Sequence, residues 1–327
     1  MISELHIDKL NQLNSQSEKN FFDIDDMDWS QKVDHTIDWV PEEMNYLSYL
    51  PSYQRLEEKY RIRYNHLYAL SVCEQFVWLE KNLLAGILTD GMSTHDLPKE
   101  LATGMEHFYT EEEKHGEMFW RTLEKAEPDW YLNNRTFKIF KTNFLQDLFF
   151  SMITKYNTVF LVWIWLALFF EERTLDFSKK YQKNYMNNKS KLDFNFWQVH
   201  YFHLKDEIRH CQMDEIFLAQ YYNSAPKWKR SLCGHMFNKL IAAYLAPHRN
   251  AKRMLNILQE EFPELKESPI INNLISELPL LKLDENFQEI VLGKKAIGGT
   301  LKLMAKYDEF NPIWRLFINE KKENFLT

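Results

Sequence analysis

Two histidines and a glutamate recur on one helical face in the stretch His203-Leu-Lys-Asp-Glu-Ile-Arg-His210. The glutamate, Glu207, lies four residues after the first histidine and three before the second, and a helix with 3.6 residues per turn brings these positions to one side. Imidazole and carboxylate groups together suit metals such as iron, manganese and zinc. A single triplet is weak evidence, because the same residues also occur on solvated helix faces.

A second pair occurs in Glu112-Glu-Lys-His115, within a predicted helix over Pro98–Lys125. Glutamate and histidine at i and i+3 form the Glu-x-x-His motif with which four-helix bundles hold two carboxylate-bridged metal ions. The neighbouring Glu111 and Glu113 lack this spacing to a histidine, so we expect them to face water. Two further helices must each supply one inward glutamate to complete such a site.

Glu80 is the inward glutamate predicted for a helix over Gln54–Leu88. A buried carboxylate without a partner is costly, so an inward glutamate implies a cation or a strong hydrogen-bond donor. Glu74 shares its helical face with Ser71 and Lys81, and we expect it to be solvated. The positions one helical turn from Glu80 are all apolar, namely Phe76, Val77, Leu83 and Leu84.

The remaining glutamate is Glu171 or Glu172, in a predicted helix over Thr158–Lys183. The apolar run after Thr158 is too short to span a bilayer and is typical of a buried helix. The exposed stripe that we expect beyond this run aligns with Glu172, which favours Glu171 as the inward residue. Because the run is apolar on all sides, the choice between Glu171 and Glu172 remains open. The stripe consists of Asp176, Lys179 and Lys183.

Three further residues of the predicted helix Phe194–Tyr222 are candidates to support the metal ligands. Carboxylates commonly orient metal-bound imidazoles, so Asp206 is a candidate to hold a histidine of a neighbouring helix. An ordinary exposed pair between this aspartate and a lysine is the alternative. Arg209 flanks the ligands, and His200 lies on the same stripe two turns before Glu207, where we expect a pocket residue.

The composition bounds the class of protein. With 8 glycines and 10 prolines in 327 residues, the chain has few breaks, and its long periodic segments predict an all-α fold. The 40 lysines and arginines against 47 acids leave a net charge of −7, which argues against nucleic-acid binding despite a local patch at Lys227–Arg230. Three cysteines form no disulfide framework and no signal peptide or membrane span is predicted, so we expect a cytoplasmic protein.

We expect a single domain over residues 1–327. Residues 1–55 show no sustained helical period and are predicted to form an arm that packs on the bundle, residues 56–223 to hold the metal-binding core helices, and residues 224–327 to add C-terminal helices. The segment Ala296-Ile-Gly-Gly-Thr300 lacks the context of a phosphate loop and is predicted to be a turn or a close helix contact. The remaining predicted helices are Arg135–Thr154, Lys227–Leu245, Ala251–Glu261 and Lys294–Ala305.

In order and spacing, four segments resemble the p-aminobenzoate N-oxygenase (AurF-like) diiron family. They are Phe76-Val-Trp-Leu-Glu80, Glu112-x-x-His115, a glutamate deep in a Trp-rich apolar helix, and the stretch His203–His210. The resemblance covers about residues 35–310 and implies a ferritin-like helical bundle with an additional N-terminal arm and C-terminal helices. It also implies a metal site of four glutamates and three histidines, in which His203 is the histidine that ordinary ferritin-like diiron proteins lack.

The ligands implied by the resemblance are Glu80, Glu112, His115, Glu171, His203, Glu207 and His210. One family feature is missing, because no arginine occurs between Arg253 and Arg315 to bind a substrate carboxylate. Lysines there could replace the arginine only as point charges, which argues against p-aminobenzoate itself more than against N-oxygenation. These lysines are Lys294, Lys295, Lys302 and Lys306.

The implied function is that of a non-haem diiron oxygenase that activates O2 and oxidises the nitrogen of an arylamine-like compound. The implied cofactor is two iron ions, with manganese as the alternative metal. The expected partners are O2, a small-molecule amine and an electron donor, with a homodimer as one assembly to consider. Two alternatives remain: a diiron hydroxylase or desaturase that acts on carbon, and a ferritin-like iron-handling protein without enzymatic activity. The long extension after residue 226 favours an enzyme, because ferroxidase bundles are usually shorter.

Overall fold

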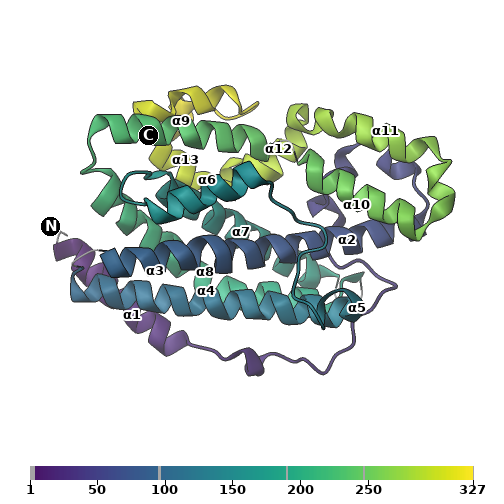
Figure 1. Ribbon diagram of the computed structural model, residues 1–327, viewed down its shortest axis with the longest axis horizontal. Helices are drawn as coiled ribbons and strands as arrows, with labels where there is room; N and C mark the ends of the chain where they lie inside the picture. Colours follow the sequence, from purple (N-terminus) through teal and green to yellow (C-terminus); the bar gives the residue numbers. More distant parts are fainter. Residues whose placement is uncertain (1–3, 95–96, 189–190, 246, 327) are drawn as a thin grey trace.

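Four long helical segments form the centre of the computed structural model, which describes residues 4–94, 97–188, 191–245 and 247–326 (Figure 1). The described residues are helical or irregular, with one isolated bridge between Asp38 and Leu192 instead of a sheet. The all-α prediction is therefore confirmed. The segments of the bundle are α2 (Glu58–Val77) with α3 (Ala85–Thr94), α4 (Lys99–Ala126), α7 (Val162–Asn187) and α8 (Phe194–Phe217).

A π-helical segment, η5 (Trp78–Leu84), joins α2 to α3 without a break in the chain direction. Glu80 lies inside this segment. Wide helical turns of this kind occur frequently at functional sites. The predicted helix over Gln54–Leu88 is thus found with a later start and a later end. Helix α8 continues in the same way into the π-helical η7 (Leu218–Tyr222).

The N-terminal segment contains a helix that the sequence analysis did not predict. Helix α1 (Glu4–Asn20) packs on α4 and α8 with a narrow buried stripe that includes Leu10 and Leu13. The prediction of a non-helical arm is wrong for these residues, because so thin a stripe within a polar sequence gives little periodic signal. The rest of the segment is irregular with short 3₁₀ turns, η1 (Ile24–Asp26), η2 (Glu42–Met44), η3 (Tyr46–Tyr49) and η4 (Tyr53–Arg55).

Between α4 and α7 the chain forms α5 (Pro128–Tyr131), an extended stretch and α6 (Phe144–Lys155). The predicted helix Arg135–Thr154 is therefore confirmed only in its second half. Glu74 explains the first half: its carboxylate accepts the backbone N–H groups of residues 138–140 and the hydroxyl of Tyr131. Glu74 is fully buried, so the prediction that it is solvated is wrong.

Helix α7 begins at Val162, after a short turn, and passes through the centre of the bundle. None of the described helices is long and apolar enough to cross a membrane. Glu172 turns toward α13 (Lys294–Met304), where the backbone N–H of Thr300 donates to its Oε2 at 2.8 Å. A Cβ at Gly299 would lie 2.1 Å from Glu172 Oε1, so the glycine permits the close helix contact that the sequence predicted.

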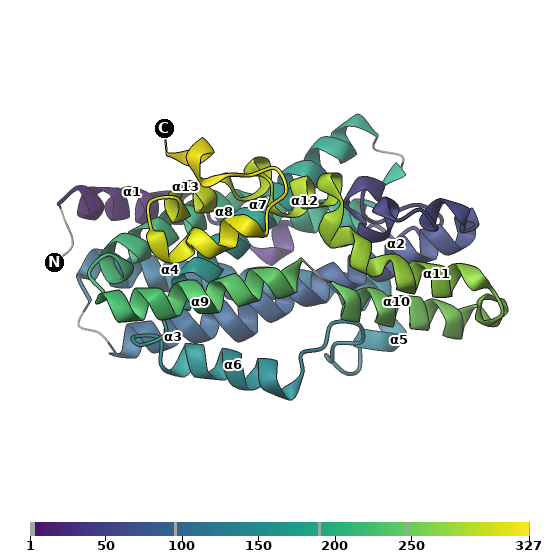
Figure 2. The same ribbon diagram turned by 90° about the horizontal axis from the view of Figure 1, so that it is seen from above.

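The stripe predicted to be exposed below Glu172 is only partly so. Lys179 and Lys183 are exposed, but Asp176 is buried beside Arg173 and Lys180. The C-terminal third packs above the bundle (Figures 1 and 2). Besides α13 it contains α9 (Lys227–Tyr244), α10 (His248–Glu261), α11 (Pro269–Glu277), α12 (Glu285–Leu292) and the 3₁₀ segments η8 (Pro263–Lys266), η9 (Leu278–Leu283), η10 (Asp308–Arg315) and η11 (Lys322–Phe325).

Candidate metal centre

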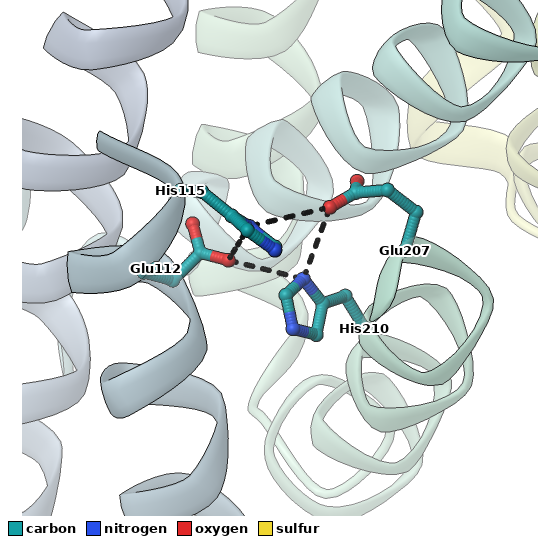
Figure 3. Close-up of side chains that lie close together, drawn as sticks. All are labelled: Glu112, His115, Glu207 and His210. Carbon is teal, nitrogen blue, oxygen red and sulfur yellow. Dashed lines mark ion pairs between the residues drawn. The ribbon is translucent and has the colours of Figure 1, made fainter. Parts of the chain in front are cut away.

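Helices α4 and α8 bring two glutamates and two histidines together in the core (Figure 3). The Nδ1 atom of His115 lies 3.7 Å from a carboxylate oxygen of Glu112 and 3.7 Å from one of Glu207. The Nδ1 atom of His210 lies 3.0 Å and 3.4 Å from the same two oxygens. One ligand atom from each residue lies within 4.8 Å of all the others, which is the spacing that one cation can bridge.

A second group overlaps the first and consists of Glu80, His115 and His203. Glu80 Oε1 lies 3.2 Å from His203 Nε2, and Glu80 Oε2 lies 3.9 Å from His115 Nδ1. The two groups share His115, and Glu207 of the first group also approaches the second, because its Oε1 lies 3.1 Å from His203 Nε2. Glu80 belongs to the π-helical η5, which packs on α4.

Glu171 completes the cluster from α7, with Oε2 at 3.5 Å from His210 Nδ1. The structure thus brings all seven residues predicted as ligands into one cluster, while Glu172 points away to α13. Each of the seven side chains is at most 2% exposed. The local reason is helical phase, because each glutamate and histidine stands on the face that its own helix buries.

The chemistry of this cluster fits a cation. Among the described residues, none of the four glutamates forms an ion pair with a lysine or arginine. Several buried atoms make no hydrogen bond: both oxygens of Glu112, one each of Glu80 and Glu207, and Nδ1 of His115 and His210. Burial and neighbouring carboxylates raise the pKa of Glu80 and Glu207 well above normal and that of Glu171 to about 7. Divalent cations would remove this cost.

Asp206 and its partners orient His115 from the side away from the cluster. Asp206 Oδ2 lies 3.0 Å from His115 Nε2 and 2.9 Å from Lys114 Nζ, and Arg209 contacts the other oxygen. Burial opposes the charge of this aspartate, but the contacts with His115, Lys114 and Arg209 outweigh it and hold the Asp206 pKa below its usual range. The exposed-pair alternative for Asp206 is therefore wrong, since the residue is fully buried.

Glu111 plays the corresponding part for His210, and the sequence analysis missed it. Its Oε2 lies 2.9 Å from His210 Nε2, and its Oε1 accepts from Arg209 at 2.6 Å and from Ser17 at 2.5 Å. Glu111 is buried, so the prediction that it faces water is wrong. The sequence signal that could have identified Glu111 was Arg209, because a cation next to the ligands needs an acid as its partner. The second partner, Ser17, gave no signal, because it belongs to α1, which was not predicted.

His200 lies outside the carboxylate cluster. Its ring stacks on Tyr181 at 4.9 Å and contacts Phe76, Phe119 and Phe177. Burial lowers the His200 pKa to about 3, so the imidazole is neutral at physiological pH. The residue belongs to an aromatic wall beside His203, which agrees with the expectation of a pocket residue rather than a ligand.

Comparison with known proteins places this site in a family. No curated protein matches the chain. A family model described as P-aminobenzoate N-oxygenase AurF matches residues 6–267, which include the whole carboxylate–histidine cluster. This family has a ferritin-like helical bundle with a dimetal site, as the described helices and the buried cluster lead one to expect. The chain belongs to the AurF family of diiron N-oxygenases, and it is an enzyme of that family.

Proposed function

We propose that the protein uses two iron ions and O2 to oxidise the nitrogen of a small aromatic amine. The observation that carries this proposal is the cluster of four buried glutamates and three histidines, in which no glutamate pairs with a lysine or arginine of the described residues. Seven donors suffice for two ions with positions left for oxygen. Membership of the N-oxygenase family supports the choice of nitrogen as the reacting atom.

The distances suggest how the ligands divide. Glu112 and Glu207 each approach both His115 and His210, which suits bridging carboxylates, because each glutamate has two oxygens to offer. Glu80 and His203 stand on the His115 side, and Glu171 stands on the His210 side. One ion would then take His115, His203 and Glu80, and the other His210 and Glu171.

Two ferrous ions would supply electrons for the reduction of O2, and an external donor would restore them. Conversion of the amine to the hydroxylamine takes one oxygen atom from O2, and two electrons and two protons reduce the other to water. The protein itself orients the metal ligands and excludes water from the site. Asp206 and Glu111 hold the Nε2 atoms of His115 and His210, which leaves both Nδ1 atoms toward the glutamates of the cluster, where they would be available to the ions.

The substrate carboxylate of p-aminobenzoate has no evident partner in the C-terminal region. The four lysines of that region, which we considered as substitutes for an arginine, are all exposed, so none lies in the interior near the cluster. They are Lys294, Lys295, Lys302 and Lys306. An aromatic amine without a carboxylate is therefore the substrate class that we propose.

A cavity of about 260 Å³ at one end of the bundle offers a route of approach. Ile87 and Met105 line this cavity. Ile87 lies seven residues after the proposed ligand Glu80, and Met105 lies seven residues before the proposed ligand Glu112. Seven helical residues span about 10 Å, so a ligand confined to the cavity would not reach the metals. We propose that the amine passes this cavity before it meets the ions.

The experiment supplies the iron-loaded protein with a chemical reductant, isotopically labelled O2 and aniline derivatives with and without a carboxylate. We expect labelled hydroxylamine or nitro products, with the uncharged amines preferred. Glu112→Ala should abolish product, and the neighbouring Glu113→Ala should not. Oxygenated carbon in place of nitrogen would favour the hydroxylase or desaturase alternative. Oxygen consumption that yields only ferric iron would favour the iron-handling alternative.

A further inference from the structure

Helix α6 lies on the outside of the bundle with its apolar side chains turned outward. Figure 2 shows it as the outermost helix on its side, beside α3 and α9. Ile153 is its only fully buried residue. Exposed fractions between 51 and 77% are found for four large apolar side chains of α6 and its end, Phe144, Leu145, Leu148 and Tyr156.

These side chains form a continuous face. Leu148 follows Leu145 by three residues, and Tyr156 follows Leu148 by eight. These spacings put the three side chains on one side of the helix, together with the half-buried Met152. Trp228, which is 59% exposed, belongs to the same edge of the molecule, because the next residue, Lys229, donates to the backbone oxygen of Thr158 just after α6. An exposed apolar patch of this kind marks an interaction site.

The surroundings of this face are basic although the chain as a whole is acidic. Residues 216–259, which include α9 and most of α10, contain seven lysines and arginines and no aspartate or glutamate. Arg249 of this stretch reaches Gln146 of α6, so the basic stretch borders the helix. Within α6 the single acid is Asp147. The exposed cations of α6, its flanks and the basic stretch are Lys141, Lys155, Lys227, Lys239, Arg249 and Lys252.

We propose that the α6 face binds the surface of a membrane rich in anionic phospholipids. Helices that lie in the membrane interface have an outward apolar face, flanking lysines or arginines, and aromatic residues at headgroup level. The α6 face has all three, with Tyr156 and Trp228 as the aromatic residues. The basic border complements an anionic lipid surface, which attracts cations near it. The binding is peripheral, in agreement with the lack of a spanning helix in the described residues.

Charge argues against a second copy of the chain as the occupant. A two-fold dimer would pair this face with itself, so the lysines and arginines of both copies would meet, and α6 itself offers Asp147 as its single acid to oppose them. Leucine and phenylalanine side chains occupy the centre of the α6 face. This argues against nucleic acid as the occupant, because contacts with phosphates dominate the affinity of nucleic-acid binding.

The test is cosedimentation of the full-length, iron-loaded protein with vesicles. Phosphatidylcholine vesicles are compared with vesicles of phosphatidylcholine and phosphatidylglycerol in equal parts. We expect binding to the anionic vesicles, weaker binding at high salt, and little binding to phosphatidylcholine alone. Failure of the unaltered protein to bind anionic vesicles at low salt would overturn the proposal.

Two pairs of substitutions separate the apolar and the electrostatic parts. Leu145→Gln with Leu148→Gln should lower the binding constant by about tenfold or more for each leucine. The control is Leu5→Gln on α1, a leucine at least as exposed on a helix at another side of the molecule (Figure 2), which should leave binding unchanged. Equal losses in the α6 variant and this control would contradict the proposal.

The charge variant is Lys141→Gln with Lys155→Gln, for which we expect a loss of about 30-fold. Lys179→Gln with Lys183→Gln removes two exposed lysines from α7 and should change binding much less. Light scattering and a DNA-binding assay with the leucine variant complete the test. If the substitutions instead split a dimer, or abolish DNA binding while vesicles are not bound, another occupant covers the face and the proposal fails.

Discussion

The metal centre and the α6 face depart from the usual pattern of burial in opposite directions. Four glutamates lie in the core and pair with no lysine or arginine of the described residues, whereas large apolar side chains of α6 lie in water. Both arrangements cost free energy in the isolated chain, the first through lost hydration and the second through exposed apolar surface. Such departures are expected where a partner binds, and the partners that we propose are a pair of cations in one case and a lipid surface in the other.

The largest expected effect concerns the interior. Glu207 approaches all three histidines, so Glu207→Ala should reduce the iron content from about two ions per chain to less than one, because bridging carboxylates hold both ions. Metal analysis after iron-supplemented expression measures this. Glu215→Ala, an exposed acid of the same helix, serves as the control. If the Glu207 variant kept its iron, the buried glutamates would not be the cation site that the comparison assumes.

A smaller effect is expected from the carboxylate that orients a histidine. Asp206→Asn should lower iron affinity by about 10- to 100-fold, because the amide no longer holds His115 Nε2 as a charged acceptor. Competition with a chelator measures the affinity. Circular dichroism checks that the fold is intact, since Lys114 and Arg209 lose the same partner. An unchanged affinity would mean that Asp206 supports only these two cations.

Two adjacent glutamates allow metal binding to be separated from packing. Glu171→Ala should lose iron, whereas Glu172→Ala should keep it and lower the free energy of unfolding by about 1–3 kcal/mol, because the N–H of Thr300 loses its acceptor. Glu172→Gln retains an acceptor and should be milder. Metal analysis and thermal unfolding measure the two effects. Iron loss in the Glu172 variant alone would reverse the assignment.

The smallest effect is expected at the surface. Leu148→Gln should change the free energy of unfolding by no more than about 0.5 kcal/mol and leave the iron content unchanged, because the side chain is mostly exposed. Chemical denaturation measures the change. A large loss of stability would show that Leu148 supports the fold, and the contrast with the interior would then disappear.

The sequence predicted the fold class and the family, and these predictions are confirmed. The seven ligands and the division into domains remain predictions, although the seven residues do meet in one cluster. Spacings of three and four residues were sufficient for that cluster, since helical phase is a local property. The predictions that failed depended on contacts between segments far apart in the chain. Glu74 is buried only because residues 138–140 fold over it, and Glu111 only because Arg209 and Ser17 reach it.

The sequence by itself therefore determined which residues share a helical face and which metal chemistry they suit. The tertiary structure decided which carboxylates become ligands, which become partners of histidines, and which hold the backbone. The physical reason is that burial of a charged group depends on the donors that meet it in space. Glu112, Glu111 and Glu74 are all buried, yet they face unpaired imidazole nitrogens, an arginine and backbone N–H groups, respectively.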